Sequence, residues 1–97
     1  MYMERDEAIS EIRAALKRRS GKTWSVTGDR GTAWGWITID APPARRTEKT
    51  HMTTADREEL ARLLGLNDVH FQGVSIPASS QYRQEYVDRA NGRTPKR

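Results

Sequence analysis

The side chains of this 97-residue chain that could perform chemistry are few, and their spacing matches no catalytic or metal-binding pattern. His51 and His70 stand alone in the sequence. Three serines, Ser75, Ser79 and Ser80, lack the glycine-flanked elbow that exposes a nucleophilic serine. A zinc site needs paired histidine or cysteine ligands, and the chain contains no cysteine. We therefore expect no enzymatic activity, no metal, no cofactor and no small-molecule substrate.

A glycine-rich segment at residues 28–32 invites comparison with phosphate-binding loops, but its pattern argues against one. Its spacing is neither that of a dinucleotide-binding loop nor that of a Walker motif. It also joins two expected strands, whereas a phosphate cradle leads from a strand into a helix. We interpret the segment as the turn of a β-hairpin.

The remaining pattern is a pair of tryptophans among cationic side chains. Basic residues occur before the predicted hairpin, at its tip and after it. Nucleobases stack on aromatic rings while Lys and Arg contact phosphates, so this combination predicts a site for single-stranded nucleic acid. The residues of this predicted site are Trp34, Trp36, Arg30, Arg18, Arg19, Lys22, Arg45 and Arg46.

Two other interpretations of the tryptophan pair stay open. A helix or a long loop could cover Trp34 and Trp36, which would make both indoles part of the core. If exposed, the pair could instead form a hot spot for a protein partner, as in an interaction or inhibitor module, because such interfaces favour Trp and Arg. Both functional hypotheses require at least one accessible indole.

The charge distribution favours a polyanionic partner. Residues 13–49 contain nine basic and three acidic side chains, whereas the rest of the chain contains eight basic and ten acidic ones. The net charge of +4 therefore originates in the segment around the hairpin. The alternative is that this surplus is ordinary solvated surface charge.

Length and composition predict one small domain. The chain has no apolar run near the length of a membrane span and no secretory signal at its start, so we expect neither membrane association nor export. The absence of cysteine fits a reducing compartment, and we expect the protein in the cytoplasm. Residues 1–92 are the predicted domain, and residues 93–97 are a basic tail that we expect to be disordered.

Three amphipathic segments predict helices. The first covers residues 4–19, and its apolar side chains follow the helical period at Ala8, Ile9, Ile12, Ala15 and Leu16. The second starts at Thr53 or Thr54, where Thr53 and Asp56 resemble a capping box, and its leucines face the core up to Gly65. The third runs from residue 79 or 80 to about residue 90, and its expected apolar side contains Tyr82, Tyr86, Val87 and Ala90.

Two strands are predicted at residues 23–27 and 32–39, because both segments are rich in β-branched and aromatic residues. A symmetric turn would pair Val26 with Ala33. It would also place Gly35 opposite Trp24, where the glycine would leave room for the indole. The predicted core face contains Trp24, Val26, Ala33, Gly35, Ile37 and Ile39, and the other face contains hydroxyl side chains with Trp34 and Trp36.

A long exposed loop is expected at residues 40–52, and a third strand at residues 69–76. The phase of the apolar residues in this strand changes at Gln72-Gly73, which predicts a β-bulge, with a tight turn as the alternative. Its pairing with the first or the second strand stays open. The order αββαβα predicts an α+β fold, a small antiparallel sheet of a hairpin plus a third strand, packed by about three helices.

Four motifs lie between residues 24 and 80: Trp-Ser-Val-Thr-Gly at residues 24–28, Arg-Gly-Thr-Ala-Trp-Gly-Trp-Ile at 30–37, Ala-Pro-Pro at 41–43 and Gly-Val-Ser-Ile-Pro-Ala-Ser-Ser at 73–80. In these motifs the chain resembles a group of short bacterial proteins of unknown function. It is also similar, more distantly, to helix-hairpin modules of large polyvalent proteins from phages and plasmids. The resemblance implies a discrete domain in a bacterial or mobile-element setting, and it assigns no activity and no site residues.

Overall fold

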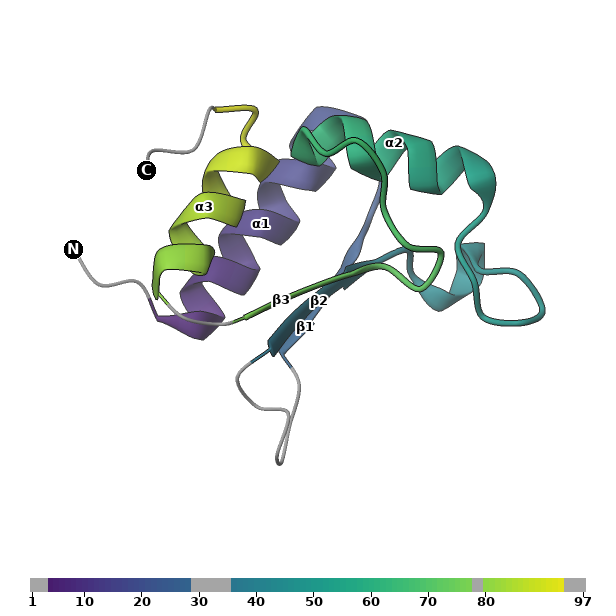
Figure 1. Ribbon diagram of the computed structural model, residues 1–97, viewed down its shortest axis with the longest axis horizontal. Coiled ribbons are helices and arrows are strands. Elements are labelled where there is room, and N and C mark those ends of the chain that lie inside the picture. The colour runs from purple at the N-terminus through teal and green to yellow at the C-terminus, as the bar shows by residue number, and fades with distance from the viewer. Residues whose placement is uncertain (1–3, 29–35, 78–79, 94–97) are drawn as a thin grey trace.

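The computed structural model describes residues 4–28, 36–77 and 80–93 (Figure 1). Its elements follow the predicted order αββαβα and form an α+β fold. They are α1 (Arg5–Ser20), β1 (Ser25–Gly28), β2 (Trp36–Asp40), the 3-10 helix η2 (Pro43–Arg45), α2 (Thr54–Leu64), β3 (Val74–Pro77) and α3 (Ser80–Ala90).

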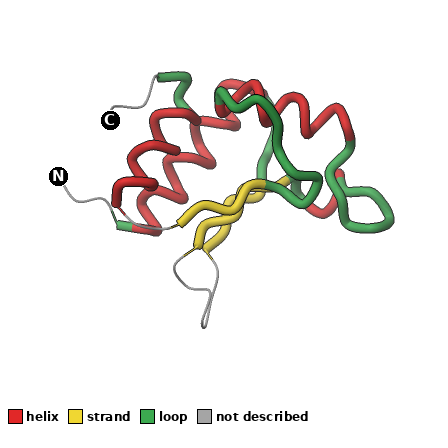
Figure 2. The backbone as a smooth tube through the Cα atoms, viewed as in Figure 1, coloured by secondary structure: helices red, strands yellow, loops and turns green. Residues whose placement is uncertain are grey.

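The helices and the sheet form two layers. The three strands are antiparallel in the order β1-β2-β3, so β2 is central and β3 pairs with β2. Helices α1 and α3 lie side by side against one face of this sheet, and the C-terminal ends of α1, α2 and α3 come together beside it (Figures 1 and 2). Within the described residues, no helix combines the length and apolar content needed to cross a bilayer.

Helix α1 buries the side that its periodicity predicts. Acidic residues in its first turn and basic residues in its last turn both favour the helix dipole. Gly21 ends the helix in the left-handed conformation with φ of 73°, and its N–H donates to Lys17 O. The buried residues of α1 are Ala8, Ile9, Ile12, Ala15 and Leu16, as predicted.

The predicted register of the hairpin is wrong, although the predicted faces are right. Val26 pairs with Ile39 where the symmetric turn would have paired it with Ala33, a shift of six residues. The expected pairing of Trp24 with Gly35 fails for the same reason. Because the shift is even, each strand keeps its inward face, and Trp24, Val26, Ile37 and Ile39 are all buried. The pairing of β1 with β2 ends at Gly28 opposite Ile37, and Ala33, Gly35 and the rest of residues 29–35 lie outside the described residues.

The cause of the shift is the burial of the two isoleucines of β2. In the predicted register Ile37 would lie opposite Lys22 and Ile39 opposite Ser20, before the first strand begins. In the observed register Ile39 pairs with Val26 and Ile37 pairs with Ile76. Apolar cross-strand pairs of this kind stabilise a sheet, so the sequence of β2 selects the longer hairpin.

The third strand is shorter than predicted, because a tight turn occupies its expected first half. Gly73 N–H donates to His70 O at 2.9 Å, and β3 begins at the next residue. The β-bulge interpretation is therefore wrong, and the alternative of a tight turn is correct. Gly73 has φ of 99°, and a Cβ atom there would lie 2.5 Å from Ile39 O. Glycine is thus required both by the backbone conformation and by the neighbouring strand.

The edge of the sheet at β1 is covered by α1. Arg13 Nη2 donates to Val26 O at 2.6 Å, which satisfies a carbonyl group of this edge strand. A bare edge strand invites pairing with other chains, and charged side chains are a common protection against it. The guanidinium of Arg5 lies against Gly28 at the end of the same strand.

The segment between β2 and α2, expected to be a long exposed loop, is buried at both of its ends. Ala41 and Met52 are buried, and Met52 N–H donates to Phe71 O at 2.8 Å. Thr53 caps α2 by accepting a hydrogen bond from Asp56 N–H, as predicted, and Leu60, Leu63 and Leu64 of α2 are buried.

Helix α3 differs from its predicted pattern at both ends. Val87 and Ala90 are buried, but Tyr82 is 38% exposed, and Arg83 is buried in its place. Arg93, expected to begin a disordered tail, is bound to Asp88: its backbone N–H donates to Asp88 O and its guanidinium to Asp88 Oδ1. Residues 94–97 of the predicted tail lie outside the described residues.

A pair of glycine substitutions separates backbone strain from steric contact. Gly21→Ala and Gly73→Ala both place alanine at positive φ, which costs about 1–2 kcal/mol. Gly21 has no atom within 4 Å of the new Cβ, whereas Gly73 has Ile39 O at 2.5 Å. We expect Gly73→Ala to lower the free energy of unfolding by at least about 1 kcal/mol more than Gly21→Ala, measured by urea denaturation. Equal losses would contradict the close approach of Gly73 to β2.

Candidate functional site

The face of the sheet opposite the helices, here called the outer face, carries a tryptophan and a row of hydroxyl groups. Paired residues share a face, so Thr27, Thr38 and Ser75 form a row across the three strands. Trp36 and Pro77 form the next pair on this face. Trp36 is 44% exposed, which makes it the most exposed large apolar side chain among the described residues. For Trp36 the interpretation as a covered core residue is therefore wrong.

Arg46, at the other end of the same face, is held by Asp40. The register places Asp40 on the outer face, and Arg46 Nη2 lies 3.5 Å from its Oδ2. Arg46 Nε donates to Ala41 O at 2.8 Å, and Asp40 Oδ1 accepts from Ala41 N–H at 2.7 Å. Burial raises the pKa of Asp40, and the Ala41 N–H and the Arg46 guanidinium oppose that rise. Arg46 is thus a cation of the outer face with one carboxylate partner.

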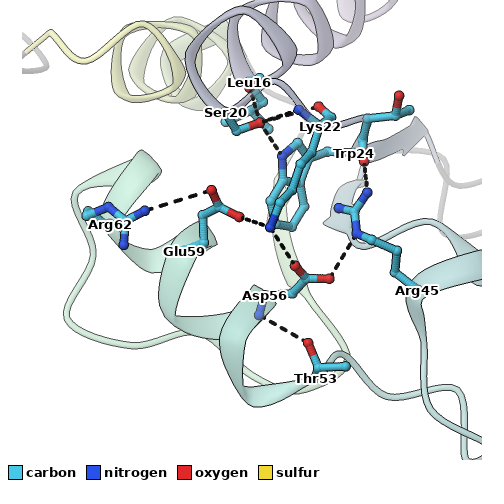
Figure 3. A network of polar contacts seen from close by, with 10 residues as sticks. Leu16, Ser20, Lys22, Trp24, Arg45, Thr53, Asp56, Glu59 and Arg62 are labelled. Carbon is cyan, nitrogen blue, oxygen red and sulfur yellow. Dashed lines mark hydrogen bonds and ion pairs between the residues drawn. The ribbon is translucent and has the colours of Figure 1, made fainter.

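Lys22 and Arg45 come together beside the indole of Trp24, where both are bound to Asp56 (Figure 3). Lys22 Nζ lies 3.6 Å from Asp56 Oδ1 and 2.7 Å from Glu59 Oε1, and its hydrogen bond to Glu59 raises the pKa of Lys22. Arg45 Nε lies 3.1 Å from Asp56 Oδ2. Both predicted phosphate ligands therefore make ion pairs within the protein. Sequence reasoning identified Asp56 only as part of a helix cap, because its two cationic partners lie far from it in the sequence.

Trp24 is the centre of this polar network. Its Nε1–H donates to Ser20 Oγ at 3.0 Å, and Ser20 Oγ donates to Leu16 O at 2.7 Å. The Arg45 guanidinium lies over the indole, with Cζ 4.8 Å from the ring centroid, and its Nη1 donates to Thr23 O at 2.8 Å. The cation thus faces the π-system of a buried ring, an arrangement that stabilises both groups. We conclude that Arg45 fastens the segment after β2 to the chain between α1 and β1 and to α2.

The two arginines at the end of α1 contact α3 and the end of α2. Arg19 Nη1 donates to Leu63 O at 2.8 Å and to Ala90 O at 2.7 Å, at the C-terminal ends of α2 and α3. Arg18 donates to the side chain of Asn91. Arg19, in the last turn of α1, thus contacts the carbonyl ends of two other helices, a position that cations favour.

The structure therefore divides the predicted site residues among several places. Trp36 and Arg46 share the outer face, Lys22 and Arg45 lie at the junction of α1 and α2, and Arg18 and Arg19 lie at the helix ends. The remaining two predicted residues, Trp34 and Arg30, lie outside the described residues.

The two histidines flank a phenylalanine. The ring centroids of His51 and His70 each lie 4.1 Å from that of Phe71. His70 Nδ1 accepts a hydrogen bond from Gln72 N–H at 3.1 Å, which ties the imidazole to the tight turn before β3. Throughout residues 4–28, 36–77 and 80–93, no three His, Asp or Glu side chains form a group that could hold a metal ion.

Comparisons of the chain with protein-family models, curated proteins and solved structures found no match. The resemblance to short bacterial proteins stays a prediction. No residue role is carried over from another protein.

Substitution of Asp56 tests whether the Lys22 and Arg45 ion pairs hold the junction together. The Asp56 side chain is 5% exposed, and its loss would leave Arg45 without its carboxylate partner. We expect Asp56→Ala to lower the free energy of unfolding by about 2–3 kcal/mol in urea denaturation followed by tryptophan fluorescence. Asp68→Ala is the matched control, because Asp68 is 78% exposed and pairs with Arg57 at 3.5 Å. Its expected loss is below about 1 kcal/mol, and a similar loss for both variants would contradict the role of Asp56.

The raised pKa of Asp40 predicts a pH dependence of stability with a defined sign. Burial raises the folded pKa above the ordinary value of 3.8, so the folded protein binds this proton more tightly than the unfolded chain does. The contribution of neutral Asp40 to stability is present below the ordinary value and is lost as pH rises through the folded pKa. Asp40→Asn stays neutral and keeps an acceptor for Ala41 N–H. Its stability relative to the parent protein should therefore increase between about pH 3 and about pH 7, measured by thermal unfolding. A decrease over that range would show that the ion pair with Arg46 dominates.

Proposed function

We propose that the protein is a non-enzymatic accessory protein that binds single-stranded nucleic acid across the outer face of its sheet. The observation that carries this proposal is the exposure of Trp36 on a face opposite to the one packed by α1 and α3. The resemblance to bacterial and mobile-element proteins supports a bacterial cytoplasm as the setting of this function.

The outer face supplies a surface on which bases can stack. Stacking of a base on an aromatic side chain contributes about 1–3 kcal/mol and tolerates any base. In the hydroxyl row, the exposed Thr27 and Ser75 add groups that donate and accept hydrogen bonds on the same face as Trp36. Because the row carries no charge, these groups suit bases and sugars better than phosphates.

The phosphate contacts in this proposal are fewer than the sequence predicted. Lys22 and Arg45 are paired with Asp56 away from the outer face, Arg46 is paired with Asp40 on that face, and Arg30 belongs to the predicted hairpin tip. For single strands, each phosphate contact contributes about −0.7 to the slope of the logarithm of the binding constant against that of the salt concentration. Six contacts would give a slope of about −4, and two would give about −1.4. We expect the smaller value.

An exposed tryptophan beside a row of uncharged hydroxyl groups also suits a protein partner, because interface hot spots favour Trp. This alternative, an interaction or inhibitor module, uses the same face. It differs from the proposal in its response to nucleic acid. A protein that binds no oligonucleotide at low ionic strength, but loses a protein partner on substitution of Trp36, would fit the alternative and contradict the proposal.

Substitution of Trp36 tests the proposal directly. The full chain is titrated into a fluorescein-labelled single-stranded oligonucleotide at several salt concentrations, and binding is followed by anisotropy. Trp36→Ala should weaken binding about tenfold, and Trp36→Phe should retain most of it, because an aromatic ring still stacks. Tyr82→Ala is the matched control: Tyr82 is 38% exposed but belongs to α3, in the helical layer. No binding by the parent protein, or equal binding by Trp36→Ala, would overturn the proposal.

A further inference from the structure

A pocket of about 390 Å³ lies where the C-terminal ends of α1, α2 and α3 meet, on the helical side of the molecule (Figure 1). Four arginines from different segments line it: Arg19, Arg62, Arg89 and Arg93. Two further lining residues are Gly65, which ends α2, and Gly92, which follows α3. We call this the arginine pocket. The sequence offers no motif for it, because the first and last of its cations, Arg19 and Arg93, are 74 positions apart.

Two of these arginines are fixed in place by the helix ends. Arg19 Nη1 donates to Leu63 O and Ala90 O, and Arg89 Nη1 donates to Leu64 O at 3.0 Å. Arg89 Nε also donates to Glu85 Oε2 at 3.0 Å. These bonds satisfy carbonyl groups at the ends of α2 and α3 and place positive charge at the negative ends of both helix dipoles. They also hold both guanidinium planes without further loss of side-chain entropy when a ligand binds.

The packing of one glycine shows how closely a guanidinium is built into the pocket wall. A Cβ atom at Gly92 would lie 3.2 Å from Arg19 Cζ and 3.3 Å from its Nη2. Gly92 has φ of 76°, so it closes α3 and leaves space for the arginine at the same time. The position of Arg19 thus belongs to the fold and does not depend on a flexible surface side chain.

Both fixed arginines keep hydrogen-bond donors. A guanidinium has five N–H groups, and the bonds of Arg19 to described residues all use Nη1. Its Nε and Nη2 therefore have no partner within the described chain, and neither has Nη2 of Arg89. Donors held in a planar fork match the oxygen atoms of a phosphate group.

The other two arginines, at the rim of the pocket, are more exposed. The side chain of Arg62 is 72% exposed and lies 3.8 Å from Glu59, which is closer to Lys22 at 2.7 Å. Arg93 is 56% exposed and pairs with Asp88 at 2.8 Å. The four arginines thus face three carboxylates, those of Glu59, Asp88 and Glu85, and one of these is shared with a lysine. The pocket has a positive surplus.

We propose that the arginine pocket binds a phosphate group, free or carried by a small organic molecule. Arg19 and Arg89 supply the fixed donors, and Arg62 and Arg93 close over the anion from the rim. The volume of about 390 Å³ lies in the range of small-ligand pockets and leaves room beside the phosphate for an organic part. This site is separate from the outer face of the sheet.

The test uses the full ¹⁵N-labelled chain, titrated with inorganic phosphate and, in a second arm, with adenosine monophosphate. Sodium chloride at matched ionic strength controls for screening. We expect saturable shifts of the backbone amides of Gly65 and Gly92 and of the Nε–H of Arg19. Tighter binding of the nucleotide would show that the organic part also occupies the pocket. Equal affinities would show that only the phosphate is recognised, and both results support the proposal.

A double variant localises the binding. Arg62→Gln with Arg93→Gln should weaken binding about fivefold, as expected for the loss of two partly screened charges. Lys17→Gln with Lys49→Gln is the control, since it lowers the net charge equally at exposed positions outside the pocket. Three results would each overturn the proposal: no saturable shift with either ligand, the same shifts with chloride, or unchanged affinity in the arginine double variant. None of them bears on oligonucleotide binding through Trp36.

Discussion

The burial of the Trp24 indole is the interaction on which the arrangement of this small domain depends. Burial of an indole removes its apolar ring from water, and its N–H then needs a hydrogen-bond acceptor within the protein. Here Ser20, at the end of α1, supplies that acceptor, and Arg45 covers the ring from the loop after β2. Arg45 then needs a carboxylate, which Asp56 of α2 provides. Through these contacts one aromatic side chain, which directly precedes β1, links α1, η2 and α2.

That junction explains why the positive charge of the sequence is a poor guide to the surface. Lys22 and Arg45 are close to the predicted hairpin in sequence, and their charge is compensated by Asp56 and Glu59 of a distant helix. Arg19 is similarly bound to carbonyl groups of α2 and α3. Conversely, Arg62, Arg89 and Arg93 lie in segments with balanced charge and gather in one pocket. Three-dimensional proximity, and not local composition, decides which cations stay available to a ligand.

The fold could be predicted further than the site. Periodicity was sufficient for the buried side of α1, and the alternation of residues in the strands was sufficient for the inward faces of Val26, Ile37 and Ile39. The register was not predictable from the turn residues, because it pairs Val26 with Ile39, six residues beyond the partner that a symmetric turn would give. The phase change at Gln72-Gly73 indicated a break in the strand without deciding between a bulge and a tight turn, and the close approach of Gly73 to Ile39 O is visible only in the structure. Of the predicted site, exposure of Trp36 was the one feature that the alternation of faces could anticipate.

The contact between Arg13 and Val26 O has a consequence for how other chains can approach the sheet. A peptide that extended the sheet beside β1 would have to displace this arginine from the carbonyl group. Addition of a strand is a common mode of peptide recognition and a common route to fibrillar aggregation, and both are disfavoured on this side of the molecule. The sheet is thus protected against edgewise growth at β1, while its outer face, with Trp36, stays accessible. Ligands and partners are directed toward the flat surface of the sheet and away from this margin.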